Sequence, residues 1–174
     1  DIDEWFGTVI NRFVAQAVIG IPLSIYGSGG QTKGFLPLRD AMQCMVRLIN
    51  SPPKPGVYDV VNQISGVFNL MDLARIIQKI GKEFGLKVKI QRLQNPRVEA
   101  DEHPLEVIYD NLPEKYDFKP SITLEDEIRE MFKLLTQPEI KKRIQEKAHV
   151  IMPKTRWSGE KKESFVLIHI GNHY

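Results

Sequence analysis

Apolar residues recur every three or four positions in five stretches of this chain, a spacing typical of amphipathic helices. The first helix is predicted over 5–18 and ends at Gly20, because Pro22 then requires an extended exit. The second begins near Arg39 and Asp40. We expect its buried stripe to consist of Met42, Met45, Val46 and Ile49.

Three further helices are predicted in the second part of the chain. Asn69 is a good N-terminal cap for the first of them, and Gly85 is placed to end it in the left-handed conformation. Thr123 caps the next helix. Pro138 begins the last one, which we expect to run to about His149.

Three short stretches predict strands, at 23–26, 57–61 and 86–93. A polar, glycine-rich loop, 27–34, follows the first, and the proline-rich segment 51–56 separates the second helix from the second strand. Three strands and five helices are too few alternating elements for a complete doubly wound sheet. The pattern therefore predicts a small α/β unit, either free-standing or completed by a sheet or cleft outside the chain.

The composition is that of an ordinary globular domain, with 174 residues, 42% of them hydrophobic and 26% charged. A formal net charge of +2 is too even to indicate nucleic acid or a membrane surface. No apolar run approaches the roughly 20 residues that span a bilayer. The single cysteine, Cys44, excludes an internal disulfide, and we expect it in the core of a cytoplasmic protein.

The glycine-rich loop 27–34 is a candidate phosphate-binding loop, because glycines let backbone N–H groups approach an anion. It fits neither standard motif. A Walker loop needs Gly-Lys-Ser/Thr, whereas Lys33 follows Thr32 and precedes Gly34. A dinucleotide fingerprint opens a helix, whereas this loop leads to Phe35. A flexible turn between strands therefore stays an equal alternative.

The remaining polar residues give one further candidate. The four histidines lack the spacing of metal ligands, so we expect no metal site. Arg97, behind Pro96 in the polar segment 95–103, can bind a diphosphate through two oxygens or join a surface ion-pair network. Spacing alone favours the surface network.

In order along the chain, these segments resemble the carboxy-terminal half of the extended short-chain dehydrogenase/reductase family. The resemblance covers 1–158, and the polar tail 159–174 is not part of it. The motifs that carry it are 6–13, Pro22-Leu23-Ser24-Ile25-Tyr26-Gly27, 29–34, Arg39-Asp40, 56–62, 69–73, 95–103 and 151–153 with Trp157.

The resemblance implies a small mixed α/β substrate-binding subdomain of such an enzyme, without its Rossmann half. Family members remodel nucleotide sugars with bound NAD. Their Gly-x-x-Gly-x-x-Gly loop and Tyr-x-x-x-Lys pair do not occur here. The resemblance therefore implies that NAD binds to a missing amino-terminal half, that no catalytic residue lies in this chain, and that the chain alone is inactive.

The resemblance also implies a nucleotide sugar such as UDP-glucose as the ligand, admits sulfite as a second substrate, and implies a homodimer of the full-length enzyme. Phe35 could wall a uridine pocket or belong to the core, and Arg12 could contact the ligand or be a surface charge. A 4-epimerase, a 4,6-dehydratase and a non-catalytic nucleotide-sugar-binding fragment stay as alternatives. The expected substrate-binding residues are Thr8, Asn11, Gln31, Lys33, Phe35 and Arg97.

Overall fold

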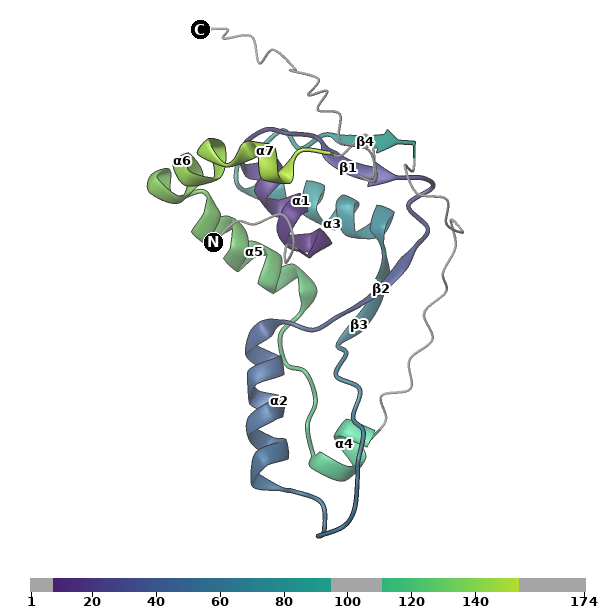
Figure 1. Cartoon of the computed structure of the whole chain (residues 1–174). Coiled ribbons are helices and arrows are strands. Elements are labelled where there is room, and N and C mark those ends of the chain that lie inside the picture. The colour runs from purple at the N-terminus through teal and green to yellow at the C-terminus, as the bar shows by residue number, and fades with distance from the viewer. Residues whose placement is uncertain (1–7, 95–110, 154–174) are drawn as a thin grey trace, which may run out of the picture.

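The computed structural model describes residues 8–94 and 111–153 (Figure 1), so the predicted tail 159–174 lies outside the described residues. The fold is mixed α/β, as predicted. In chain order the elements are α1 (Val9–Val18), β1 (Leu23–Tyr26), β2 (Thr32–Phe35), α2 (Leu38–Asn50), β3 (Gly66–Asn69), α3 (Leu70–Glu83), β4 (Ile90–Leu93), α4 (Asn111–Tyr116), α5 (Leu124–Leu135), α6 (Pro138–Glu146) and α7 (Ala148–Ile151).

The described strands form two small sheets of two strands each. β1 pairs in parallel with β4, and Tyr26 lies opposite Leu93. β2 pairs antiparallel with β3, and Lys33 lies opposite Phe68. Because β1 and β4 are parallel, their carboxyl ends lie at the same edge of the sheet. The glycine-rich segment 27–31, which we call the glycine turn, leaves β1 from that edge and leads into β2.

The main core lies where α1, α3 and α5 pack against one another and against β1 (Figure 1). Phe13, Ile77 and Phe132 are fully buried there. Phe84 stacks on Phe132 with 5.3 Å between the ring centroids. Full burial of such a side chain contributes about 1.5–3 kcal/mol, so these helices hold the fold together more than the short sheets do.

The helix caps predicted at Asn69 and Thr123 and the helix end predicted at Gly85 are confirmed. The Asn69 side chain accepts a hydrogen bond from the backbone N–H of Asp72 at 2.7 Å, and Thr123 Oγ1 accepts one from Asp126 at 3.1 Å. Gly85 follows α3 with φ at +71°, the left-handed conformation that glycine adopts without steric cost.

The prediction of a buried stripe on α2 is wrong. The stripe faces outward, with Met42, Met45, Val46 and Ile49 exposed by 51%, 42%, 53% and 76%. The buried residues of α2 lie on the other side, where Cys44 packs against Phe118 as the core residue that we expected. The amphipathic pattern identified the helix, but no described element covers its apolar face.

The strand expected at 57–61 is not formed among the described residues. The alternation of a strand is present, since Tyr58 and Val60 are exposed while Asp59 and Val61 are partly buried. No described strand pairs with the segment, and a strand requires a partner for its ladder of hydrogen bonds. The pattern of side chains was therefore correct and the pairing was not.

Several other boundaries differ from the prediction because pairing and packing set them. The strand expected over 86–93 is paired only in its second half, as β4. β2 lies largely within the expected loop, and β3 was not predicted; each is a strand because the other supplies its hydrogen bonds. The last helix ends at Glu146, and the short α7 follows it.

Candidate functional site

The carboxyl ends of β1 and β4 define the edge at which a ligand is expected. The backbone N–H of Gly27 donates to the carbonyl of Leu93 at 2.9 Å, so the glycine turn begins beside the end of β4. In open α/β sheets, ligands bind at the carboxyl ends of parallel strands. Arg97 follows Leu93 along the chain, but it lies outside the described residues.

The glycine turn packs against the start of α3. The carbonyl of Gly29 accepts a hydrogen bond from Met71 N at 3.1 Å, and that of Gln31 accepts one from Leu70 N at 3.2 Å. Gly29 has φ at +79°, and a Cβ there would lie 2.9 Å from Ile25 Cγ2. The turn is thus a packed part of the fold, which does not support the alternative of a flexible connection.

This turn does not have the architecture of a dinucleotide fingerprint. It leads into β2, whereas the fingerprint opens a helix whose first N–H groups bind the pyrophosphate. The described residues of the turn therefore do not fit NAD in that manner.

Gln31 has a polar atom that no described residue satisfies. Its Nε2 donates to the carbonyl of Tyr26 at 3.4 Å, while its Oε1 is buried without a hydrogen-bond partner among the described residues. An unsatisfied buried acceptor costs about 1–3 kcal/mol. A ligand that donates a hydrogen bond at this position would remove that cost.

Arg12, which the sequence left undecided, carries a second unsatisfied polar atom. Its Nε is buried without a hydrogen-bond partner in the described part of the chain, and its guanidinium lies 5.8 Å from the centroid of the Phe13 ring. Burial lowers the pKa of Arg12, and the neighbouring Tyr26 partly offsets this effect. A guanidinium that keeps an unsatisfied N–H donor is suited to bind an anion.

Thr8 and Asn11 are exposed at the start of α1, next to Arg12. Thr8 is the N-terminal cap, but its side chain makes no capping hydrogen bond, so the helix does not engage its hydroxyl there. Arg12 interacts electrostatically with Tyr26, the last residue of β1. The start of α1 and the carboxyl end of β1 are therefore neighbours.

β2 carries Lys33 and Phe35 on one face, because side chains two apart in a strand point the same way. Lys33 is exposed. Phe35 is half-buried against the core, and its ring centroid lies 6.1 Å from that of Phe68. The carbonyl of Phe35 also accepts hydrogen bonds from Ser65 N and Oγ, both at 2.8 Å.

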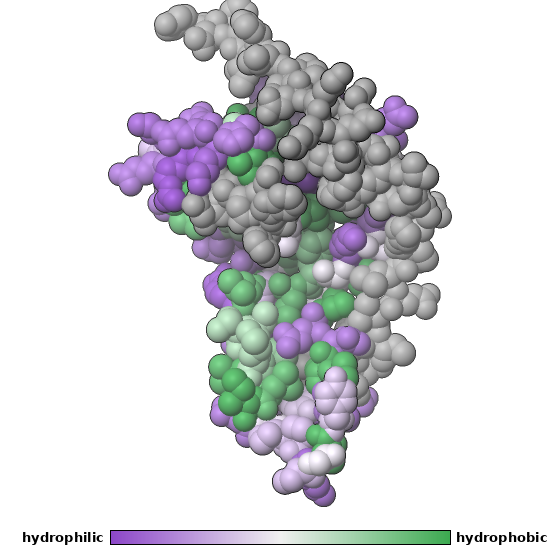
Figure 2. Space-filling view, viewed as in Figure 1, coloured by the Kyte–Doolittle hydropathy of each residue, from purple (hydrophilic) through white to green (hydrophobic). Residues whose placement is uncertain are grey.

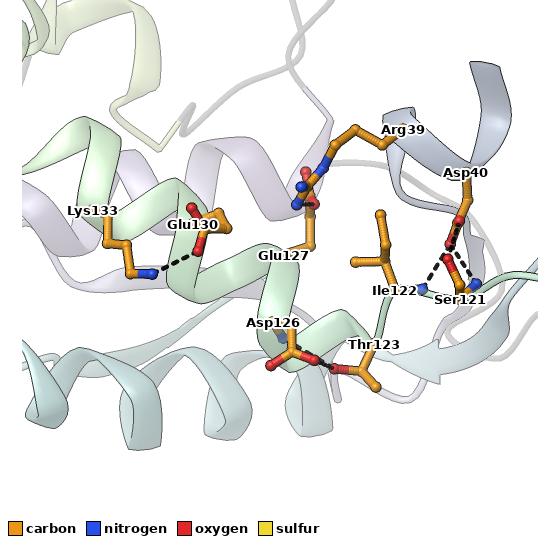
Figure 3. Close-up of polar contacts among 9 residues, drawn as sticks. All are labelled: Arg39, Asp40, Ser121, Ile122, Thr123, Asp126, Glu127, Glu130 and Lys133. Carbon is orange, nitrogen blue, oxygen red and sulfur yellow. Dashed lines mark hydrogen bonds and ion pairs between the residues drawn. The ribbon is translucent and has the colours of Figure 1, made fainter. Parts of the chain in front are cut away.

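The Arg39-Asp40 pair of the family motif joins α2 to the region around α5 (Figure 3). Asp40 is fully buried and accepts hydrogen bonds from Ser121 and Ile122, in the segment that precedes α5. Arg39 Nη2 lies 3.2 Å from Glu127 Oε2. Both residues thus connect α2 to α5 or to the segment that precedes it.

Residues 8–94 and 111–153 contain neither a metal site nor a membrane-spanning helix. No three His, Cys, Asp or Glu side chains of these ranges gather as a metal site would require. Within the same ranges, no helix has the length and apolar character needed to cross a membrane.

No family model matches this chain, but curated relatives do. It is 41% identical over 157 residues to the UDP-sulfoquinovose synthase of Sulfolobus acidocaldarius. This match covers 90% of this chain and 39% of that protein. It is 38% identical over 157 residues to the chloroplastic UDP-sulfoquinovose synthase of Spinacia oleracea, covering 90% and 32%. The chain therefore spans well under half the length of these relatives.

Solved structures share its fold. The epimerase Mth375 of Methanothermobacter thermautotrophicus superposes with a TM-score of 0.64 at 15% identity, covering 83% of this chain and 41% of that one. The UDP-glucuronic acid 4-epimerase of Bacillus cereus, crystallised with UDP-glucuronic acid and NAD, gives a TM-score of 0.60 at 17% identity, covering 79% and 40%.

The chain shares its α/β fold with part of each of these two epimerases. Over nine tenths of its length the chain is similar to two proteins named UDP-sulfoquinovose synthase. The resemblance inferred from the sequence motifs is confirmed.

Proposed function

We propose that this chain is the nucleotide-sugar-binding part of a UDP-sulfoquinovose synthase, which makes UDP-sulfoquinovose from UDP-glucose and sulfite with NAD as cofactor. The observation that carries the proposal is the match to two proteins of that name over 90% of the chain. The structure supports it with a ligand edge of the kind that α/β proteins use, at the carboxyl ends of β1 and β4.

In this proposal the diphosphate is held by cations around that edge. Arg97 can bind two phosphate oxygens through its forked guanidinium, and the exposed Lys33 supplies a point charge. Thr8 and Asn11 offer a hydroxyl and an amide from the start of α1 for the sugar or the phosphates. Gln31 offers the acceptor that lacks a described partner, and Phe35 forms an apolar wall.

We assign NAD and the catalytic residues to a dinucleotide-binding half outside this chain. The glycine turn leads into a strand, and no tyrosine of the sequence has a lysine four residues later. When bound, NAD supplies the transient oxidation and reduction of the sugar. The chain alone is then inactive, and the complete enzyme is a cytoplasmic homodimer.

A second candidate function is a 4-epimerase or a 4,6-dehydratase, because solved structures with this fold include both. Those structures are 17% and 18% identical to this chain, against 41% for the synthase of Sulfolobus acidocaldarius. The synthase is therefore favoured.

The experiment is a calorimetric titration of the chain with UDP-glucose, comparing Arg97→Ala with the exposed control Arg47→Ala. Loss of a charge-assisted contact costs about 1.5–3 kcal/mol, so Arg97→Ala should weaken UDP-glucose binding about ten- to hundredfold. Arg47→Ala should leave it unchanged. Equal affinities for both variants would reduce Arg97 to a surface ion pair.

A further inference from the structure

Gln16 on α1 and Ser24 on β1 are buried polar residues that hydrogen bond to each other. Among the polar and charged residues of the described chain, only these two and Asp40 are buried. Gln16 Oε1 accepts from the backbone N–H of Ser24 at 3.3 Å, and Gln16 Nε2 lies 3.4 Å from Ser24 Oγ. A leucine would fill the same space, so what the amide adds is a fixed alignment of α1 with β1.

The contacts between α1 and β1 continue from this pair to Arg12 and Tyr26, towards the ligand edge. Arg12 lies four residues before Gln16, on the same side of the helix. Tyr26 lies two residues after Ser24, on the same side of the strand. Four residues of a helix rise about 6 Å and two residues of a strand about 6.6 Å, so the two spacings match. Since Arg12 interacts electrostatically with Tyr26, the Gln16–Ser24 bonds set how these two side chains meet.

The Gln16 amide also holds a third segment. Its Nε2 donates to the carbonyl of Ile151 at 2.7 Å, the shortest hydrogen bond of this side chain. Ile151 is buried in the main core, and α7 packs against α1 (Figure 1). Residues 151–153 are among the motifs that carry the family resemblance. One buried side chain therefore joins α1, β1 and the segment 148–153.

The outer pair of this line ends in an atom that a ligand can satisfy. Arg12 Nε is buried without a hydrogen-bond partner in the described chain, whereas both polar atoms of the Gln16 amide are bonded. The inner pair is thus complete without a ligand and the outer pair is not. This order is expected if Gln16 prepares the site and Arg12 takes part in binding.

We propose that Gln16 is a positioning residue of the nucleotide-sugar site. It aligns α1 with β1 so that Arg12 and Tyr26 meet at the carboxyl end of β1. Its bond to Ile151 makes this alignment depend on the docking of 148–153. This inference rests on the proposed function. Because Gln16 is fully buried, it acts on a ligand only through the residues that it positions.

The test is a calorimetric titration of the purified chain with UDP-glucose, comparing Gln16→Leu with Ile144→Ala below the melting temperature of each variant. Gln16→Leu should weaken binding about tenfold, as loss of a residue that orients a binding group does in metal sites. Ile144→Ala is the control for stability, because it removes packing from the core of α6 and keeps every bond of Gln16. Its affinity should equal that of the unchanged chain.

Two further measurements guard this comparison. Figure 2 shows apolar side chains gathered over α2, and such a surface promotes association, so light scattering should give the same mass for every variant. If Gln16→Leu does not fold, Gln16→Met replaces it, because an unbranched side chain keeps the shape of glutamine and still removes its bonds.

Nuclear magnetic resonance gives a readout that needs no ligand. Gln16→Leu should shift the amide signals of Arg12, Tyr26 and Met152, since their segments are held through this amide. Ile144→Ala should leave those of Arg12 and Tyr26 in place. The inference is overturned by unchanged affinity in Gln16→Leu, by an equal loss in Ile144→Ala, or by unchanged signals of Arg12 and Tyr26. If the unchanged chain binds no UDP-glucose, the proposed function is contradicted, and these signals alone decide whether Gln16 positions Arg12 and Tyr26.

Discussion

The buried carboxylate of Asp40 accepts two hydrogen bonds from Ser121, one from its backbone N–H at 3.0 Å and one from its hydroxyl at 3.1 Å (Figure 3). A third comes from the backbone N–H of Ile122 at 3.0 Å. α2 is otherwise lightly attached, because its apolar stripe faces outward. The position of α2 therefore depends strongly on this side chain, beside the Arg39–Glu127 pair and the packing of Cys44 on Phe118.

Replacing Asp40 by alanine should leave these donors buried without an acceptor. The expected loss is about 3 kcal/mol in the free energy of unfolding, measured by urea denaturation. Asp40→Asn is the matched control, because an amide oxygen can still accept from the two backbone N–H groups. If both variants lose the same small amount, Asp40 does not anchor α2.

Gln16 should hold the segment around Ile151 onto the core. Its Nε2 donates to the carbonyl of Ile151 at 2.7 Å, and its Oε1 accepts from the backbone N–H of Ser24 at 3.3 Å. Gln16→Leu keeps the volume and removes both bonds, so we expect a loss of about 2 kcal/mol by urea denaturation. Gln78→Leu removes one bond from a half-buried side chain and should cost less. Equal losses would contradict this assignment.

Lowering the pH should weaken the ion pair between Glu83 on α3 and Arg129 on α5. Arg129 donates to Glu83 at 2.9 Å, and this hydrogen bond lowers the pKa of Glu83. The contribution of the pair is therefore complete above the ordinary pKa of glutamate and is lost as the pH falls through the lowered pKa.

The melting temperature of Arg129→Gln should thus lie below that of the unchanged chain at neutral pH, with the gap closing as the pH falls below the ordinary pKa of glutamate and through the lowered pKa of Glu83. Arg75→Gln is the control, because Arg75 pairs with Asp72 within a single helix. A gap that stays constant across this pH range would show that the Glu83–Arg129 pair does not act as described.

Cys44 should resist alkylation in the folded chain. Burial raises the pKa of its thiol, and the reactive species is the thiolate. Iodoacetamide at about pH 8 should therefore modify Cys44 slowly in buffer and rapidly in denaturing urea, as followed by mass spectrometry. Equal rates in the two conditions would place the thiol at the surface.

Features set by neighbouring residues were predictable from the sequence. The caps at Asn69 and Thr123 and the turn at Gly85 depend on a few adjacent positions, and each was predicted correctly. The face that α2 buries depends on Phe118, far along the chain, and 57–61 has no partner strand among the described residues. Periodicity finds an apolar face, but it does not say what covers that face.

The candidate site, too, could be predicted only in part from the sequence. The motifs identified the turn that carries Gln31 and Lys33, and the structure places it beside the end of β4. Arg12 was undecided because its burial depends on contacts with Tyr26 and Phe13 that spacing does not specify. The role of Arg97 stays a prediction, since it lies outside the described residues.

The most direct measurement is a nuclear magnetic resonance titration of the isotopically labelled chain, first with UDP-glucose and then, separately, with NAD. We expect UDP-glucose to shift the amide signals of Thr8–Arg12 and Gly29–Lys33 in a saturable manner, because Arg12 and Gln31 both interact with Tyr26 at the carboxyl end of β1. NAD should produce no saturable shift. Signals that UDP-glucose leaves unchanged, or saturable binding of NAD, would contradict the assignment of this chain as the nucleotide-sugar-binding part.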